Sequence, residues 1–411
     1  MNVLMVSQYF WPEGFRVNDL VLSLKAHGVH VDVLTGKPNY PKGALFDGYR
    51  MWGCQVERWE GIDLHRVPLA PRGDSGALRL LLNYLSFIVF GTLFGAWMLR
   101  GKKADVVFVY GMSPILQAIP AVFLKWVKGA KLVVWVQDLW PESLEATGFV
   151  RNRLALALVR MVVRWIYRRA DLILVQSEAF IAPVAALADP AKVKYYPNSA
   201  DDVFKALPTD APCDIAGLEA GFSVVFAGNL GNAQAVDTII EAAALLRDYP
   251  VIRLYLVGSG SRSAWLAQQV ISRGLSNVIL AGQFPLTSMP GILGRASALL
   301  VTLKDASIFN QTIPSKIQAY LAMGKPIIAC LNGEGARIVS KAGAGISCPA
   351  EDPAALARTI IALQQMTAPE RAAMGEQARL YFDRHFDSAM LTDVLIDHLA
   401  ALPGVAGAVN S

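Results

Sequence analysis

The sequence predicts an α/β protein built from two doubly wound domains, each with a parallel sheet covered by helices. The first observation is that short apolar runs alternate with helical patterns along the whole chain, in two series. Such alternation is typical of parallel sheets that are buried on both faces. The second is the length of 411 residues, which is more than one hydrophobic core organises. We therefore expect one domain from each series.

The first domain is expected over residues 1–200 and the second over residues 201–375. A polar stretch with two prolines, residues 198–221, is typical of a linker. Two helical patterns end the chain, and we expect residues 376–411 to pack back on the first domain. The expected strands are, in order, NVLMVSQY, VHVDVLTG, LHRVPL, DVVFVYG, KLVVWVQD, DLILVQS and VKYYPN, then FSVVFAGN, IRLYLVGSG, NVILAGQ, ALLVTL, PIIACL and GISCP.

The two sheets also predict where a ligand binds. In open parallel sheets, ligands bind beyond the carboxyl ends of the strands, so we expect a site in a cleft between the domains. Gly228 and the pair Gly258 and Gly260 follow strands of the second domain, where a tight turn lets the backbone approach a phosphate. The alternative is an ordinary turn at a strand end. Ser263 stands where a dinucleotide fingerprint has its third glycine, so NAD binding is not supported.

The positions of the cysteines and histidines indicate which disulfides and metal sites the protein can form. The four cysteines are scattered and form no C-x-x-C, which indicates free thiols in a reducing compartment. The five histidines form no H-E-x-x-H and no cluster with cysteine, so we expect no metal site. The opening MNVLMVSQYF is typical of a buried strand and lacks the charged start of a signal peptide. No bound cofactor is expected.

Charge is concentrated in the first half of the chain. The first 200 residues hold 23 lysines and arginines against 15 aspartates and glutamates, a net charge of +8, while the remainder has −3. A basic half predicts an acidic partner, such as nucleic acid, anionic lipid or a phosphorylated substrate. The sequence has no interleaved aromatic and basic motif and no helix-turn-helix signal, so nucleic acid is not expected.

Two segments of the basic half favour a membrane surface. Residues 80–99 form an uncharged run long enough to span a bilayer. A span would separate two strands of one sheet, so we expect this run to be buried against the sheet or to lie in the membrane surface. In residues 153–169, one helical face carries Leu158, Val159, Val162 and Ile166. The other face carries Arg153, Arg160, Arg164 and Arg168.

The second pattern is that of a helix lying in an anionic interface, where basic residues meet lipid headgroups. The alternative is a helix that packs on the sheet and carries a solvated arginine stripe. Because two such segments occur in the basic half, we expect the protein to dock on a membrane surface.

The stretch NQTIPSKIQAYLAMGKP, residues 310–326, predicts a short helix. Ser315 is the expected N-cap, positions 317, 320 and 321 form one buried face, and Gly324 ends the helix in the left-handed conformation. Lys316 then lies in the first turn, where the helix dipole disfavours a cation. A bound phosphate would explain a lysine there. The alternative is that Lys316 points into water.

Six motifs occur in order along the chain: QYFWPEGFRVNDL with VDVLTGKPNYPKG, VQDLWPESLEATG, YYPNSADDVF, FAGNLGNAQAVDTIIEA, YLVGSGS and IPSKIQAYLAMGKPIIA. Together they resemble the family-4 glycosyltransferases of the GT-B fold, in the branch that builds bacterial surface polysaccharides. The resemblance covers nearly the whole chain. It implies two Rossmann-like domains facing each other across a cleft, and a nucleotide-sugar donor that is UDP-linked.

The resemblance implies roles for residues of the second domain. Asn310 and Gln318 stand where the family has glutamates that contact the donor sugar and the ribose, so amides replace both carboxylates. Asn229 and Gln234 stand where the family has an arginine and a lysine for the pyrophosphate. Lys316 is then the best remaining cation for the diphosphate. The expected donor-binding residues are Gly228, Asn229, Gln234, Gly258, Gly260, Arg262, Ser315 and Gln318, and Asn310 and Lys316 are assigned to catalysis.

The resemblance also implies a mechanism, which is retaining transfer without a bound metal. In this mechanism, fixed hydrogen-bond donors stabilise the leaving diphosphate. Asp138 ends a strand and is expected to orient the acceptor hydroxyl or to steady charge, the alternative being a helix N-cap. Gln137 stands near the position of a family histidine. The expected lining of the acceptor or phosphate side is Gly14, Phe15, Arg16 and Gln137.

The leading hypothesis is a peripheral membrane glycosyltransferase at the cytoplasmic face of the inner membrane. It moves an amino- or deoxy-hexose to a lipid-pyrophosphate-linked saccharide in O-antigen or capsule synthesis. Two alternatives stay open: a non-catalytic scaffold that binds nucleotide or membrane, and a GT-B-like sugar-nucleotide epimerase. An NAD-dependent dehydrogenase lacks its fingerprint.

Overall fold

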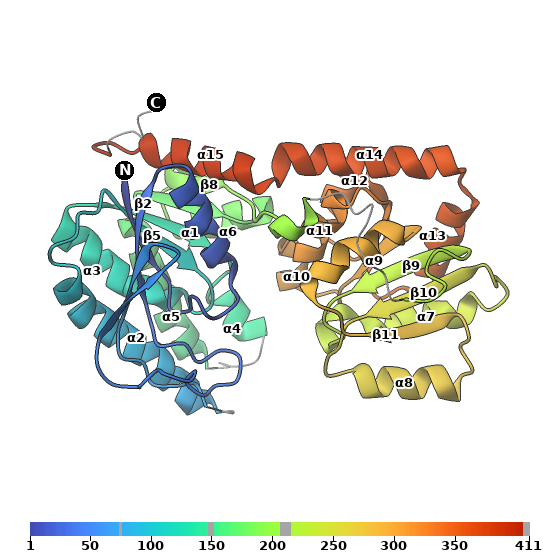
Figure 1. The fold of residues 1–411 in the computed structure, drawn as a ribbon, viewed down its shortest axis with the longest axis horizontal. Coiled ribbons are helices and arrows are strands. Elements are labelled where there is room, and N and C mark those ends of the chain that lie inside the picture. Colours follow the sequence, from blue (N-terminus) through green and yellow to red (C-terminus); the bar gives the residue numbers. More distant parts are fainter. Residues whose placement is uncertain (74–75, 147–151, 206–214, 406–411) are drawn as a thin grey trace. The chain divides into compact units, whose positions relative to one another are not determined.

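The computed structural model of the protein describes residues 1–73, 76–146, 152–205 and 215–405. The chain forms two compact units, Met1–Tyr196 with Leu391–Ser411, and Pro197–Met390 (Figure 1). The boundary expected at residue 200 lies close to the observed one. The boundary expected at residue 375 falls inside α14 (Ala368–His385), which belongs to the second unit. Residues 206–214 of the expected linker lie outside the described residues.

The first unit contains a sheet of eight strands: β1 (Asn2–Val6), β2 (His30–Thr35), β3 (Gln55–Trp59), β4 (Ile62–Arg66), β5 (Val106–Gly111), β6 (Lys131–Val136), β7 (Leu172–Val175) and β8 (Val193–Tyr195). Their order is β3-β4-β2-β1-β5-β6-β7-β8. All neighbours are parallel except β3 and β4. The seven strands expected here are therefore confirmed, and β3 is the strand that the sequence pattern missed.

Helices cover both faces of this sheet: α1 (Arg16–Ala26), α2 (Ala77–Met98), α3 (Ala118–Lys128), α4 (Glu142–Ala146), α5 (Arg153–Arg169), α6 (Ile181–Ala185) and α15 (Ser388–Ala400). Alternate strand residues point to opposite faces. On one face, Val107 and Val134 share a core with Leu124 of α3 and Val163 of α5. The hydroxyl groups of Ser23 on α1 and Thr392 on α15 lie 2.7 Å apart, so these two helices pack together.

Helix α2 packs on its neighbours along one side only. It is long and apolar enough to cross a membrane, yet only 22% of its most apolar window is buried. Gly91 and Gly95 form the close contacts: a β-carbon would lie 3.0 Å from Pro120 of α3 and 2.8 Å from Leu34 of β2, respectively. The helix joins β4 to β5 within one sheet, as expected. Burial against the sheet is confirmed for this side, while its outer side stays exposed.

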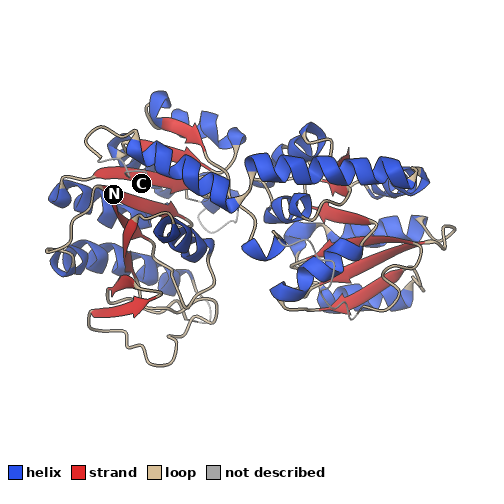
Figure 2. Ribbon diagram, turned by 45° about the horizontal axis from the view of Figure 1, so that its top comes forward, coloured by secondary structure: helices blue, strands red, loops and turns tan. Residues whose placement is uncertain are grey.

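The second unit contains a six-stranded sheet, coloured red with the other strands in Figure 2. Its order is β11-β10-β9-β12-β13-β14, and all neighbours are parallel. All six strands expected here are confirmed. The elements are β9 (Phe222–Ala227), α7 (Val236–Leu245), β10 (Ile252–Val257), α8 (Ser263–Ser272), β11 (Val278–Gly282), α9 (Met289–Arg295), β12 (Ala298–Thr302), α10 (Ser307–Gln311), α11 (Ser315–Ala322), β13 (Ile327–Cys330), α12 (Glu334–Lys341), β14 (Gly345–Cys348), α13 (Pro353–Gln365) and α14.

Both sheets have a topological switch point. In the second unit the chain runs from β9 outward through β10 and β11, then returns beside β9 and runs the other way from β12. In the first unit the same reversal occurs between β1 and β5. Because the connecting loops separate at such points, they leave a crevice at the carboxyl ends of the strands. Candidate ligand sites therefore lie beyond β9 and β12, and beyond β1 and β5.

Candidate active site

Two glycine loops lie against each other at the switch point of the second unit. Gly228 follows β9 and Gly258 follows β10, with φ of +131° and +134° that other residues rarely adopt. A β-carbon on Gly258 would lie 2.0 Å from the Gly228 carbonyl oxygen, and one on Gly260 would lie 2.5 Å from the Leu230 carbonyl oxygen. The loops can approach this closely only because these residues are glycines. The expectation that the backbone approaches a phosphate here stays a prediction.

Lys316 in the first turn of α11 points at the first of these loops. Its ε-carbon would lie 2.6 Å from a β-carbon on Gly228, and its Nζ lies 3.6 Å from the centre of the Phe226 ring. Nζ is shielded from solvent and has no hydrogen-bond partner among the described residues. This burial lowers the pKa of Lys316 to about 7. The alternative that Lys316 points into water is therefore wrong.

Helix α11 differs at its start from the expectation. The N-cap is Pro314, with no side-chain cap, because Ser315 already belongs to the first turn. The other expectations for this helix are confirmed: Ile317, Tyr320 and Leu321 are buried and Gly324 has a φ of +61°. Without a side-chain cap, the first N–H groups of the helix lack a partner that a serine N-cap would supply.

Gln318, two residues after Lys316 in this helix, is fully buried. Neither its amide oxygen nor its amide nitrogen has a hydrogen-bond partner among the described residues. An unpaired buried polar group costs about 1–3 kcal/mol, and such groups call for an explanation. Lys316 and Gln318 therefore leave three polar side-chain atoms of α11 without a hydrogen-bond partner among the described residues.

The remaining residues expected in the donor site make contacts within the unit. Asn310 donates from Nδ2 to Asp305 Oδ1 at 2.8 Å. Asn229 donates from Nδ2 to Gln234 Oε1 at 3.1 Å, which fixes both amides beside the first glycine loop. Arg262 pairs with Asp237 and stacks 3.8 Å from the centre of the Trp265 ring. Since its charge is already compensated, Arg262 is a weaker phosphate ligand than Lys316.

In the first unit, Asp138 lies two residues after β6. Its Oδ2 accepts hydrogen bonds from the backbone N–H and the hydroxyl of Ser113, at 3.1 and 2.9 Å, and Trp140 Nε1 donates to the same hydroxyl at 2.9 Å. Asp138 is four residues before α4 begins and is not its N-cap. Gln137 precedes it and is half-buried. The carboxylate is thus held at the carboxyl edge of the sheet by the loop after β5.

The loop after β1 carries the other expected residues of this unit. Gly14 is exposed, Phe15 precedes α1, and Arg16 is the first residue of that helix. The Phe15 ring centre lies 5.5 Å from that of Tyr9 and 5.2 Å from that of Tyr40, so three aromatic rings gather beside this loop. These contacts join the loops after β1 and β2.

Glu13 is a residue of this loop that sequence reasoning missed. It is buried, and its carboxylate accepts hydrogen bonds from the backbone N–H groups of Phe10, Asn39 and Tyr40, at 3.1, 2.8 and 2.7 Å. Burial raises the pKa of Glu13 despite these bonds. The motif WPEG was the available signal, but its partners come from a loop that is distant in the sequence.

Helix α5 has three faces rather than two. Val163, Ile166 and Tyr167 are buried, and the arginine face is exposed as expected. The placement of Leu158 on the same face as Ile166 is wrong: Leu158 is exposed, with Leu154, Met161 and Trp165. The helical periodicity of the sequence cannot separate the buried stripe from the exposed apolar stripe, because both consist of apolar residues. Of the four expected arginines, Arg160 pairs with Glu142 at 3.4 Å.

Two doubly wound units in one chain are the architecture of the GT-B fold. Residues 14–199 match the family described as "Glycosyl transferase 4-like domain", and residues 221–366 match "Glycosyl transferases group 1". The two matches cover most of the chain. The protein is therefore a family-4 glycosyltransferase of the GT-B fold, and the resemblance seen in its motifs is confirmed.

Curated relatives support the same assignment. The chain is 29% identical over 298 residues to the probable glycosyltransferase WbjE of Pseudomonas aeruginosa, covering 71% of this chain and 73% of the relative. It is 28% identical to the putative colanic acid biosynthesis glycosyl transferase WcaI of Escherichia coli K12, covering 79% and 82%. Its fold is similar to that of HepE from Anabaena, solved in complex with UDP, with a TM-score of 0.71 at 15% identity over 98% of this chain and 100% of that one.

Proposed function

We propose that the protein is a retaining, metal-independent glycosyltransferase that uses a UDP-sugar donor and a lipid-pyrophosphate-linked saccharide acceptor. The observation that carries the donor half is the shielded, unpartnered ammonium group of Lys316 beside the Gly228 loop. A cation in that position costs free energy unless an anion compensates it. A diphosphate at the first turn of a helix, beside a glycine loop, supplies that anion.

The rest of the donor site has the chemistry of a nucleotide sugar. Gln318 is buried with free donor and acceptor atoms, which suits the paired hydroxyl groups of a ribose. Asn310 is the corresponding amide for the donor sugar. UDP as the nucleotide is supported by HepE, a protein of similar fold that was solved with UDP bound. The donor sugar in this proposal is an amino- or deoxy-hexose.

The reaction follows from a leaving diphosphate that is held by fixed donors. The bond between the anomeric carbon and the diphosphate oxygen breaks, and the acceptor oxygen attacks from the same face. The acceptor proton passes to the leaving diphosphate, so no carboxylate pair of the glycosidase kind is required. Asp138, fixed by Ser113, orients the acceptor hydroxyl. The product should keep the anomeric configuration of the donor, which NMR of the isolated product determines.

The acceptor half of the proposal draws on the relatives and on the basic first unit. The name of one relative states colanic acid biosynthesis, and we infer that this chain acts in surface-polysaccharide assembly. A lipid-linked acceptor stays in the bilayer, so the enzyme must work at the membrane surface. The exposed arginines of α5, Arg153, Arg164 and Arg168, suit docking on the anionic cytoplasmic leaflet.

A melting scan with nucleotides tests the donor site. Purified full-length protein is heated alone and with UDP, GDP, dTDP or NAD. A ligand at about 100 times its Kd adds about 2.7 kcal/mol of stability. We expect UDP to raise Tm, and Lys316→Ala to abolish the rise. Lys341→Ala, at an exposed lysine that ends α12, is the matched control and should keep it. An unchanged UDP shift in Lys316→Ala would contradict the site.

A second candidate function is a non-catalytic scaffold that binds nucleotide or membrane. It is favoured by the amides at Asn310 and Gln318, which replace carboxylates of the family pattern. Binding of UDP alone does not separate the two functions. Release of UDP from a UDP-sugar, by slow hydrolysis or by transfer, separates them, because a scaffold leaves the donor intact.

A further inference from the structure

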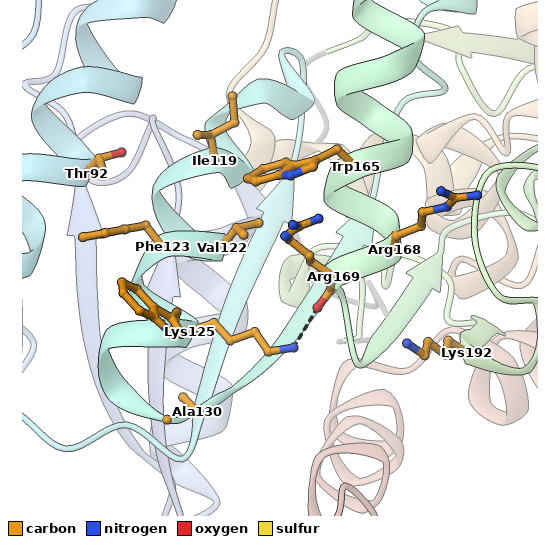
Figure 3. Close-up of a pocket in the computed structure, with 12 residues that line it drawn as sticks. Thr92, Ile119, Val122, Phe123, Lys125, Ala130, Trp165, Arg168, Arg169 and Lys192 are labelled. Atoms are coloured by element: carbon orange, nitrogen blue, oxygen red, sulfur yellow. Dashed lines mark hydrogen bonds between the residues drawn. The ribbon is translucent and has the colours of Figure 1, made fainter.

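We propose that a cavity between α3 and α5 of the first unit binds the phosphate headgroup of an anionic phospholipid. The cavity has a volume of about 910 Å³, which is within the range of sites that enclose small molecules. Figure 3 shows Lys125 and Lys192 at its lower side, Arg169 between Lys125 and Trp165, and Phe123 and Trp165 on its walls. It therefore combines cations with aromatic rings in one hollow.

The cations of the cavity exceed the carboxylates that face them. Lys125 pairs with Asp171 at 2.7 Å and donates to the Arg169 carbonyl oxygen at 2.7 Å. Among the described residues, neither Arg169 nor Lys192 has a carboxylate within ion-pair distance. Lys192 donates to the Ala170 carbonyl oxygen at 3.2 Å, and Arg169 lies 4.6 Å from the centre of the Trp165 ring. Two positive charges are thus held in place without a counter-charge.

The outer surface around the cavity is apolar. Trp126 of α3 and Trp165 of α5 both line the cavity, and they are 79% and 37% exposed. Helix α2 packs on α3 and keeps an exposed stripe along its length. This stripe consists of Leu78, Leu82, Leu85, Val89, Leu93 and Trp97. Exposed leucines, tryptophans and flanking arginines are the composition of a surface that lies at the headgroup level of a bilayer.

The cations of the cavity and the apolar surface around it together indicate which ligand the cavity binds. A soluble acidic protein or a nucleic acid would match the cations but would leave the apolar stripes of α2 and α5 in water. A phospholipid in a bilayer matches both, because its phosphate meets Arg169 and Lys192 while neighbouring acyl chains meet the stripes. Arg168 lines the same cavity, and its guanidinium points away from Lys125, toward the other flank of α5 (Figure 3).

The position of the cavity separates it from the acceptor site. Gly129 and Ala130 precede β6, Arg169 precedes β7, and Lys192 precedes β8, so the cavity opens at the amino ends of these strands. Asp138 lies beyond the opposite end of β6, a strand of six residues that spans about 20 Å. The lipid bound here is therefore a structural phospholipid of the membrane and not the sugar acceptor. The inference rests on the proposed function only for the presence of a membrane.

Vesicle sedimentation of the full-length protein tests this site. The protein is mixed at fixed salt with phosphatidylcholine vesicles that contain or lack phosphatidylglycerol. We expect binding to require phosphatidylglycerol and to weaken about 10-fold or more in the double variant Arg169→Gln/Lys192→Gln. The matched control is Lys42→Gln/Arg58→Gln, which removes the same charge from exposed residues of the same unit. It should stay within about twofold of the unchanged protein.

Each other outcome decides against the site. Equal weakening in both double variants would assign binding to diffuse charge, and no weakening in the first would leave the cavity without a role. Displacement of the vesicles by RNA would indicate a nucleic-acid surface instead. The melting transition of the ligand-free first double variant shows that it is folded. Because this control needs no nucleotide, loss of UDP binding in the unchanged protein would sink the proposed function without affecting this result.

Discussion

The side chain of Lys316 fills the space beside Gly228: a β-carbon on that glycine would come within 2.6 Å of the lysine ε-carbon. The two residues come from different elements, the loop after β9 and the first turn of α11. The contact depends on the conformation of both residues: the glycine has a φ of +131°, and the lysine ammonium group lies over the Phe226 ring. The pair is the centre of the proposed donor site.

Gly228→Ala should disturb both partners. The added methyl group meets the lysine and the backbone is strained at that φ, so we expect a loss of about 2–4 kcal/mol in the free energy of unfolding and at least 10-fold weaker UDP binding. Gly274→Ala is the control, since Gly274 has a φ of +59° and open space around it, and should cost about 1 kcal/mol with UDP binding unchanged. Denaturant unfolding and UDP titration provide both values. Normal UDP affinity in a folded Gly228→Ala variant would argue against the site.

The lowered pKa of Lys316 makes stability depend on pH. Between pH 7 and the ordinary pKa of 10.5, the unfolded chain binds a proton at this lysine and the folded chain does not. Stability of the ligand-free protein should therefore rise across this window, by at most about 1.4 kcal/mol per pH unit from this group. The cost of burying the charge is fully present below pH 7. Lys316→Met should flatten this part of the profile.

The same lysine should take up a proton when UDP binds. A diphosphate beside Nζ favours the charged form, so at pH 8 we expect uptake approaching one proton per UDP. Calorimetric titration in two buffers with different ionisation enthalpies measures the number of protons. Lys316→Met should abolish the uptake from this group. Identical uptake in both proteins would mean that the diphosphate does not meet this lysine.

Asp138→Asn tests the acceptor side without touching the donor site. The amide keeps the size of the side chain but loses the charge, so we expect transfer to fall about 100-fold while the UDP Kd stays unchanged. Ser113→Ala removes the hydroxyl that bonds to Asp138 Oδ2 and keeps the carboxylate, and should have a smaller effect on transfer. Steady-state kinetics with a lipid-linked acceptor measures both. Full transfer activity in Asp138→Asn would leave this carboxylate a structural role only.

The strands could be predicted from the sequence because buried parallel strands are continuous apolar runs. β3 could not, since Gln55–Trp59 is an edge strand with alternating exposed residues, and its charged side chains break the apolar run. Lys316 could be placed in a helical first turn from the sequence alone. Glu13 could not be found that way, because the N–H groups of Asn39 and Tyr40 reach it only in the folded loop. That the two units face each other across a cleft stays a prediction.

The apolar run at residues 80–99 is a second case in which the sequence predicted an element but not its packing. Composition predicted a long apolar helix, but it could not tell which side is buried. Asn83, a polar residue of that run, marks the buried side. It is fully buried, accepts a hydrogen bond from Gln8 Nε2 at 2.6 Å and donates one to the Ala70 carbonyl oxygen at 2.6 Å. Tyr9 also donates to it at 3.2 Å. These bonds tie α2 to the loop after β1.

Asn83→Leu should therefore destabilise the protein although it makes α2 more apolar. The substitution leaves the Gln8 amide, the Tyr9 hydroxyl and the Ala70 carbonyl without their partner, at a cost of about 2–3 kcal/mol in the free energy of unfolding. Leu85→Ala, on the exposed side of the same helix, should change it by no more than about 0.5 kcal/mol. Denaturant unfolding in detergent compares the two variants. A larger loss in Leu85→Ala than in Asn83→Leu would mean that the side of α2 bearing Asn83 is not its packed side.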